Sequence, residues 1–194
     1  MSEAALRDEL ARISIKTYER GLVRGTGGNV SVRLDSSNML ITPSGVALGD
    51  TTPANIIQVD LDTLEWVPNE PYVPSKEYRF HAEIYRARAD VQAIVHCHPP
   101  YATAYAVRKL DIPYVTDAAF KQPPMPHVTF SPSGSTELSD KVGAAARANP
   151  DFRVMMLDEH GIIAVGTSLL QAYNFADLAE EMAHIAHLAA TIPG

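Results

Sequence analysis

The sequence of 194 residues contains a single cysteine, no long apolar run and no cluster of basic residues. One cysteine cannot form a disulfide within the chain. No apolar stretch approaches the roughly 20 residues that a membrane-spanning helix requires. Residues 1–12 are charged and lack a continuous apolar core, so they do not resemble a signal peptide. We therefore expect a cytoplasmic protein with no membrane partner.

The charge balance gives a net charge of −7, without any basic stretch. Nucleic acids and anionic membrane surfaces are bound by clustered Lys and Arg, so neither is expected as the main partner. A local basic spot can still hold one small anionic substrate. The apolar content of 46% and the charged content of 20% are typical of a soluble globular protein. The length fits one domain over residues 1–194.

Hydrophobic periodicity and turn residues predict alternating helices and strands. The helices are expected at residues 3–20, from 75 onward, 100–107, 135–148 and 168–190. The strands are expected at residues 30–34, 39–41, 56–59, 64–67, 93–98, 154–157 and 162–165. The proline-rich segment 111–133 is interpreted as a loop with one or two short strands. With no repeat or long linker, this pattern indicates an α/β or α+β domain with helices on the faces of an antiparallel sheet.

Two histidines, His96 and His98, end the apolar run 93–95. Side chains alternate along a strand, so residues i and i+2 project from the same face. Two neutral imidazoles at this spacing can bind one divalent metal ion. Cys97 lies between them and faces the other way, so we expect it to be a small buried hydrophobe and not a nucleophile.

Two further residues are candidate ligands. His160 lies in a turn between two apolar strands, and Glu77 lies in the first turn of a predicted helix. Alone, His160 is typical of an exposed hairpin, and a carboxylate such as Glu77 suits the helix macrodipole. Together with His96 and His98 they supply three nitrogens and one oxygen. This donor set suits Zn²⁺, with Mn²⁺, Co²⁺ and Ni²⁺ as alternatives.

The other histidines are also considered as candidate metal ligands. His81 is four residues after Glu77 on the same helical face, so these two residues form a rival ligand pair. His184 and His187 lie one turn apart on the last helix, and we interpret them as part of a solvated face. His127 lies in a loop, and its pattern predicts no role.

Three loops rich in small and hydroxyl residues favour an anion. Residues 24–29 form a glycine loop that is either a backbone anion nest or a flexible turn. This loop follows a helix and precedes a strand, the reverse of a dinucleotide-binding motif. The second loop is 42–45. The third is Ser75–Lys76 at a helix N-terminus, where free N–H groups favour phosphate or carboxylate.

These motifs resemble the class II aldolase and adducin head-domain family. The resemblance covers nearly the whole chain and rests on five motifs in order: Gly25-Thr26-Gly27-Gly28-Asn29-Val30-Ser31, Thr42-Pro43-Ser44-Gly45, Pro74-Ser75-Lys76-Glu77, His96-Cys97-His98 and His160-Gly161. It implies a single-domain, three-layer αβα fold with a mainly antiparallel central sheet flanked by helices. It also implies a homotetramer with active sites near the subunit boundaries.

The resemblance further implies a role for each motif. The metal ligands would be His96, His98 and His160, with Glu77 as a fourth ligand or as the acid–base catalyst. The substrate phosphate would lie against a second set: Gly28, Asn29, Ser44, Gly45, Ser75 and Lys76. A metal ion held there would act as a Lewis acid and would stabilise the enediolate expected when a C–C bond breaks. The same chemistry serves aldol cleavage, epimerisation and decarboxylation of a β-keto acid.

The sequence departs from the family's sugar-phosphate aldolases in three places. Lys76 stands where those aldolases carry a second serine. They also carry a loop tyrosine near the position of Asp117, and Tyr114 can replace it only if the loop shifts. The sequence also stops at Gly194, before a segment that holds another tyrosine. The Ser-Lys-Glu motif is similar to that of the family's decarboxylases of 3-oxo-tetronate 4-phosphates.

We therefore expect a metal-dependent lyase that cleaves a small phosphorylated hydroxy-ketone by retro-aldol chemistry. Decarboxylation of a phosphorylated or aromatic keto or hydroxy acid at the same site is the first alternative. A non-catalytic, adducin-like binding domain is the second.

Overall fold

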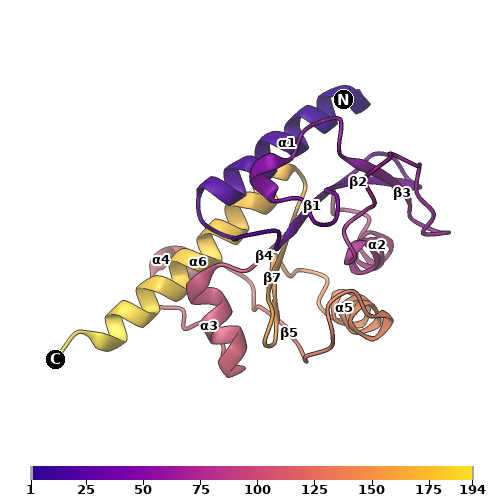
Figure 1. Cartoon of the computed structure of the whole chain (residues 1–194). Coiled ribbons are helices and arrows are strands. Elements are labelled where there is room, and N and C mark those ends of the chain that lie inside the picture. The colour runs from indigo at the N-terminus through magenta and orange to yellow at the C-terminus, as the bar shows by residue number, and fades with distance from the viewer. Residues whose placement is uncertain (1, 194) are drawn as a thin grey trace.

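The computed structural model describes residues 2–193 and contains one seven-stranded sheet in the order β3-β2-β1-β4-β7-β6-β5 (Figure 1). The strands are β1 (Asn29–Arg33), β2 (Asn38–Ile41), β3 (Ile57–Asp60), β4 (Ala93–Cys97), β5 (His127–Val128), β6 (Val154–Leu157) and β7 (Gly161–Gly166). The helices are α1 (Glu3–Glu19), α2 (Tyr78–Ala87), α3 (Pro100–Arg108), α4 (Asp117–Phe120), α5 (Thr136–Ala148) and α6 (Leu169–Thr191), with a 3-10 turn η1 (Leu48–Asp50). None of the helices within residues 2–193 is long and apolar enough to cross a membrane.

The sheet is mainly antiparallel and lies between two helical layers, as predicted. Only β5 pairs with its neighbour, β6, in parallel. Helices α1, α3 and α6 cover one face, and α2 and α5 cover the other (Figure 1). Each face buries its own hydrophobic cluster. Burial of this apolar surface is the main favourable term in folding.

Strand β4 shows how the two layers divide the side chains. Val95 and Cys97 belong to the cluster under α1 and α6, whereas Ile94 belongs to the cluster under α2 and α5. The ring of His96 contacts that of Phe80 on α2, with centroids 5.4 Å apart, so His96 shares the face of Ile94. The alternation predicted for this strand is therefore confirmed. Cys97 is completely buried, and burial raises the pKa of its thiol, in agreement with its predicted inert role.

Several helices begin at the hydroxyl residues that favour an N-cap. Ser135 accepts a hydrogen bond from the N–H of Leu138 to begin α5, and Ser168 accepts one from Gln171 to begin α6. Helix α2 differs from prediction because it begins at Tyr78, and Glu77 occupies its N-cap without a capping bond. The hydroxyl of Ser75 accepts from the N–H of Glu77 at 3.4 Å and so organises the turn before the helix.

The last helix corrects the prediction of a solvated face. The carboxylate of Glu180 accepts hydrogen bonds from the N–H groups of Tyr101 and Ala102 and thereby caps the first turn of α3. The ring of His184 stacks on Tyr101 with centroids 3.9 Å apart, whereas His187 is exposed. Helix α3 therefore covers much of the polar side of α6.

Two segments differ from the expected elements. Residues 64–67 do not form a regular strand, and Leu64 adopts a left-handed backbone with φ of 63°. The segment still pairs back to β3, through the antiparallel bridge of Trp66 to Val59 and through two backbone bonds beside it, from Asp60 to Glu65 and from Val67 to Gln58. The segment 111–133 contains one short strand, β5, as predicted. It also contains the single-turn helix α4, capped by Thr116, which is too short for a periodic signal.

The glycine loop before β1 generates a prediction. Gly28 and Gly25 both have positive φ, of +69° and +58°. A Cβ at Gly28 would lie 2.8 Å from the carbonyl oxygen of His96, whereas a Cβ at Gly25 would meet no atom within 4 Å. We expect Gly28→Ala to lower the free energy of unfolding by about 1–3 kcal/mol more than Gly25→Ala, because only it displaces β4.

Urea denaturation of both variants in the presence of a chelator measures this difference, and the shared backbone strain cancels between them. Equal destabilisation would show that the loop and β4 do not need to approach closely.

Candidate metal centre

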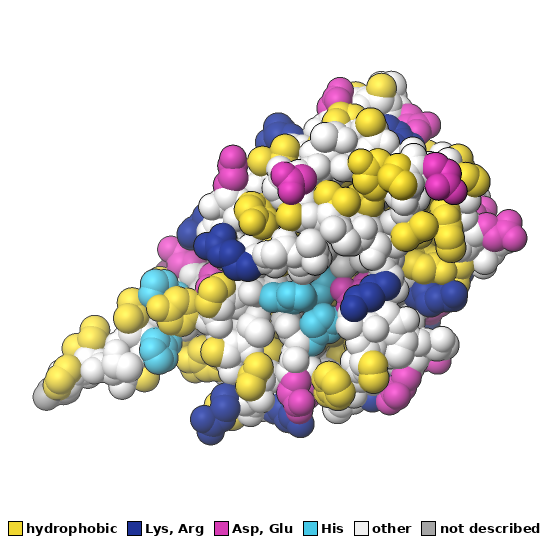
Figure 2. All heavy atoms as spheres, viewed as in Figure 1, with side chains coloured by type: hydrophobic (Ala, Val, Ile, Leu, Met, Phe, Trp, Pro, Cys, Tyr) yellow, Lys and Arg dark blue, Asp and Glu magenta, His cyan; other side chains and the backbone are white. Residues whose placement is uncertain are grey.

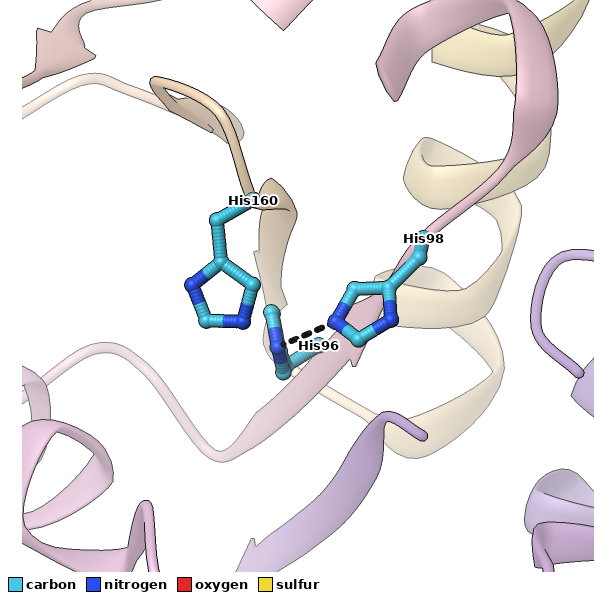
Figure 3. A group of neighbouring side chains, drawn as sticks. All are labelled: His96, His98 and His160. Carbon is cyan, nitrogen blue, oxygen red and sulfur yellow. Dashed lines mark hydrogen bonds between the residues drawn. The ribbon is translucent and has the colours of Figure 1, made fainter. Parts of the chain in front are cut away.

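Three histidines converge where β4 ends and β7 begins. His96 is in β4, His98 directly follows it, and His160 lies in the turn before β7. Because β4 and β7 pair in antiparallel register, with Cys97 opposite Ile162, the turn brings His160 against the other two (Figure 3). One nitrogen from each ring lies within 4.8 Å of the others.

The histidine rings are held by contacts outside the cluster. The Nδ1 of His96 hydrogen-bonds the carbonyl oxygen of Ile162 at 2.9 Å. Since a carbonyl only accepts, Nδ1 carries the proton and the lone pair of Nε2 is available. This Nε2 lies 3.0 Å from the Nε2 of His98. Burial, with the nearby His96, lowers the pKa of His98 to about 3 and that of His160 to about 4. Neutral imidazoles at pH 7 are what a metal ion requires, so the donor chemistry fits a divalent ion.

Glu77 faces the same nitrogens from the start of α2. Its Oε2 lies 3.2 Å from the Nε2 of His96, and its Oε1 lies 3.4 Å from the Nε2 of His160. Asn29 donates to Oε2 at 3.0 Å, and Ser133 donates to Oε1 at 2.6 Å. Burial favours the neutral acid of Glu77, whereas the hydrogen bonds donated by Ser133 and Asn29 favour its carboxylate. Glu77 is therefore a buried group whose two oxygens both accept hydrogen bonds.

The alternative pair of Glu77 and His81 is wrong. Both nitrogens of His81 are already engaged, Nε2 with the Oδ1 of Asn29 at 2.5 Å and Nδ1 with the Oγ of Ser31 at 2.7 Å. The ring is completely buried, and burial lowers its pKa to about 3, with a further contribution from His96. His81 supports the site from behind and offers no free ligand atom.

A cavity of about 220 Å³ opens beside these residues. Its lining includes all the residues that the family resemblance assigns to phosphate: Gly28, Asn29, Ser44, Gly45, Ser75 and Lys76. It also includes His98, His160, Glu77 and Ser133. Figure 2 shows histidine side chains at the surface in the centre of this face, with basic side chains directly beside them. The arrangement combines candidate ligands with groups that favour an anion.

Two other expected residues lie elsewhere. Asp117 is exposed at the start of α4 and pairs with Lys121, and the hydroxyl of Tyr114 donates to the carbonyl of Pro123. Tyr114 and His127 line a different cavity, and neither Asp117 nor Tyr114 lines the cavity at the three histidines. A role for Asp117 or Tyr114 at the metal centre stays a prediction.

Ser133 is the polar residue that sequence reasoning missed. It lies in the segment Ser131-Pro132-Ser133-Gly134 before α5, which is as rich in small and hydroxyl residues as the loop 42–45. Gly134, with φ of +77°, packs against the backbone of Lys76. The composition of this segment was the available signal, but only the packing of the two loops brings Ser133 to Glu77.

Comparison with known proteins decides the family. Residues 8–187 match the model of the Class II Aldolase and Adducin N-terminal domain. The chain belongs to this family. It is 34% identical over 182 residues to the L-fuculose phosphate aldolase of Methanococcus vannielii, covering 93% of this chain and 94% of that protein. It is 31% identical over 189 residues to the 3-oxo-tetronate 4-phosphate decarboxylase of Escherichia coli, covering 94% of this chain and 86% of that protein.

A solved structure has the same fold as this chain. YgbL from Escherichia coli superposes with a TM-score of 0.88 at 29% identity, covering 98% of this chain and 92% of that one. The predicted resemblance to the class II aldolase family and its fold is therefore confirmed. The two relatives named above, an aldolase and a decarboxylase, are both lyases.

The buried His81 generates a prediction about pH. Between pH 6.5 and its folded pKa of about 3, the unfolded chain binds a proton at His81 that the folded chain does not. The free energy of unfolding therefore falls as the pH decreases through this range, by at most about 1.4 kcal/mol per pH unit from this group. In metal-free protein, His81→Gln should reduce the loss between pH 7 and pH 5 by about 2 kcal/mol.

Urea denaturation of both proteins at the two pH values, with a chelator present, checks this expectation. An identical loss in the variant and the unmodified protein would mean that His81 takes a proton in the folded state.

Proposed function

We propose that this protein is a metal-dependent carbon–carbon lyase that cleaves a small phosphorylated hydroxy-ketone by retro-aldol chemistry. The observation that carries the proposal is the convergence of His96, His98 and His160 with the buried carboxylate of Glu77 beside a polar cavity. Zn²⁺ suits three imidazole nitrogens, and Mn²⁺, Co²⁺ and Ni²⁺ are alternatives.

The three histidines would hold the ion, which supplies Lewis-acid polarisation of the substrate's oxygens. Glu77 is the group placed to move the proton, because both of its oxygens face the histidine cluster. Its bonds from Asn29 and Ser133 restrict its rotation. A carboxylate held in this way loses little entropy when the reaction begins.

The loops around the cavity would bind the substrate's phosphate. Ser44 and Ser75 offer hydroxyl groups, Lys76 offers a full positive charge, and the loops at Gly28 and Gly45 offer backbone N–H groups. Oriented N–H groups in such loops favour anions. The names of the relatives, an L-fuculose phosphate aldolase and a 3-oxo-tetronate 4-phosphate decarboxylase, point to substrates of this class.

Decarboxylation of a phosphorylated or aromatic keto acid is the second candidate. The observation that favours it is Lys76, which lines the cavity and can bring its ammonium group to a substrate carboxylate. A non-catalytic binding domain is less favoured, because it has no need of three histidines and a carboxyl group gathered beside one cavity.

We also propose a cytoplasmic homotetramer. Large apolar side chains are exposed at Val107 in α3, at Leu110 just after α3, at Phe120 in α4, and at Leu188 and Ile192 at the end of α6. The end of α6 projects from the body of the molecule, and Figure 2 shows apolar side chains along it. Exposed apolar surface of this kind marks an interaction site. Size-exclusion chromatography with light scattering would measure the assembly.

The proposed reaction predicts defined products. Metal-loaded protein should release dihydroxyacetone phosphate and an aldehyde from L-fuculose 1-phosphate or 5-deoxyribulose 1-phosphate. Glu77→Gln should retain much of the metal but lower kcat by about 10²–10⁴-fold, because the amide cannot carry the proton. Coupled enzyme assays and metal analysis measure both effects.

Three outcomes would contradict this prediction in different ways. Release of CO₂ alone, from 3-oxo-tetronate 4-phosphate, would favour the decarboxylase. Normal turnover by Glu77→Gln would remove Glu77 from proton transfer. Less than about 0.2 metal ion per chain after gentle purification would favour the binding domain, because such sites bind their ion tightly.

Lys76 has its own prediction. Lys76→Ser should raise the KM of the phosphorylated substrate by about 10- to 100-fold, because one charge-assisted hydrogen bond is worth about 1.5–3 kcal/mol. The matched control is Lys16→Ser, since Lys16 lies over the ring of Tyr173 and does not line the cavity. An unchanged KM in Lys76→Ser, measured in steady-state assays, would exclude Lys76 from substrate binding.

A further inference from the structure

A continuous chain of buried hydrogen bonds runs from the last turn of α2 to Glu77. The hydroxyl of Tyr85 is 2.8 Å from that of Ser31, which is 2.7 Å from the Nδ1 of His81. The Nε2 of His81 is 2.5 Å from the Oδ1 of Asn29, whose Nδ2 is 3.0 Å from the Oε2 of Glu77. All five side chains are at most 4% exposed, so water cannot substitute for any of these bonds.

The orientation of the Asn29 amide decides the direction of the neighbouring bonds. Its nitrogen donates to the Oε2 of Glu77 at 3.0 Å. The Oδ1 of Asn29 therefore faces His81 and can only accept, which places a proton of His81 on Nε2. A flipped Asn29 amide would remove the bond that it donates to Glu77.

The remaining bonds follow from the same logic. Because burial keeps His81 neutral, its Nδ1 has no proton and must accept from the hydroxyl of Ser31. The Ser31 oxygen in turn accepts from the hydroxyl of Tyr85, whose proton is retained because burial raises its pKa. Each member of the chain therefore has one allowed orientation.

We propose that His81 is a positioning residue whose Nε2–H tautomer, held by Ser31 and Tyr85, locks the Asn29 amide so that Asn29 donates to Glu77 and keeps its carboxylate aimed at the histidine cluster. The effect of this positioning on turnover rests on the function proposed above. The tautomer of His81 and the orientation of Asn29 do not depend on that function. Asn29 keeps one further amide N–H for a substrate oxygen, so it couples Glu77 to the anion-binding loops.

The positioning of Asn29 by His81 explains why polar side chains are buried in this layer. His81 stacks on Phe80 with centroids 4.8 Å apart, and the ring of Phe80 in turn meets that of His96. Apolar packing thus restrains the same imidazole that the hydrogen bonds orient. A residue that only filled space there would need no donor, and a phenyl ring would serve equally well.

Two substitutions at His81 separate a positioning role from a space-filling one. Gln retains a donor near the place of Nε2, whereas Phe retains the ring shape without donor or acceptor. In zinc-loaded protein, we expect His81→Phe to lower kcat by about 10- to 100-fold with unchanged KM and zinc content, as for other supporting residues. His81→Gln should restore most of the rate.

The matched control is Asn55→Ala. Asn55 is equally buried, donates to the carbonyl of Asp50, and lies outside the chain of bonds. It should lose stability without losing kcat. Equal kcat values for His81→Phe and the unmodified protein, or an equal loss in His81→Gln and His81→Phe, would overturn the positioning role.

The tautomer is tested on the unmodified protein by ¹⁵N NMR of labelled histidine, with the His81 signals assigned from their absence in His81→Gln. A protonated Nε2 and an unprotonated Nδ1 at pH 7 are expected. A protonated Nδ1 would overturn the proposal even if the variants fail to fold. If the protein shows no lyase activity, the proposed function fails, and the NMR result still decides the order of the bonds.

Discussion

The antiparallel pairing of β4 with β7 is the constraint on which the rest of the site depends. It places His160, 62 residues beyond His98, against the end of the neighbouring strand, where the pairing ends at Cys97 and Ile162. Gly161 makes this possible, because a Cβ there would lie 2.5 Å from the carbonyl oxygen of Cys97. The same pairing supplies the carbonyl of Ile162 that holds the ring of His96. The register of the sheet and the arrangement of the three histidines are thus set by the same backbone bonds.

The site buries several polar groups, and hydrogen bonds from the surrounding structure offset the free-energy cost of burying each of them. Glu77, His81 and Asn29 are buried, and a buried polar group without a partner destabilises a fold by about 1–3 kcal/mol. Here every one of them has hydrogen-bond partners. Among the described residues, the buried side-chain atoms that lack one belong to Thr51, Thr103, His127 and Asp177, outside this network. Each buried polar side chain of the network around Glu77 therefore has a hydrogen-bond partner.

Proteins that share this fold but catalyse different reactions are expected to differ in the loops around the cavity. The histidines and Glu77 suit any reaction that places negative charge beside a carbonyl, so they do not choose between cleaving an aldol and losing CO₂. That choice depends on what the cavity binds. Lys76 brings a positive charge to a position next to Glu77 in the chain, and Ser133 adds a hydroxyl from a separate loop. Under the proposed function, specificity would therefore lie in the side chains that line the cavity and not in the three histidines.

The sequence by itself determined the donor types and the local geometry. The spacing of His96 and His98 set their shared face, because side chains alternate along any strand, and apolar periodicity located most helices and strands. Only the tertiary structure decided which other residues belong to the centre. It joined His160 and Ser133 to Glu77, excluded His81 because both of its nitrogens are engaged, and covered Glu180 and His184 with α3. These outcomes depend on contacts between segments far apart in the chain, for which local pattern carries no signal.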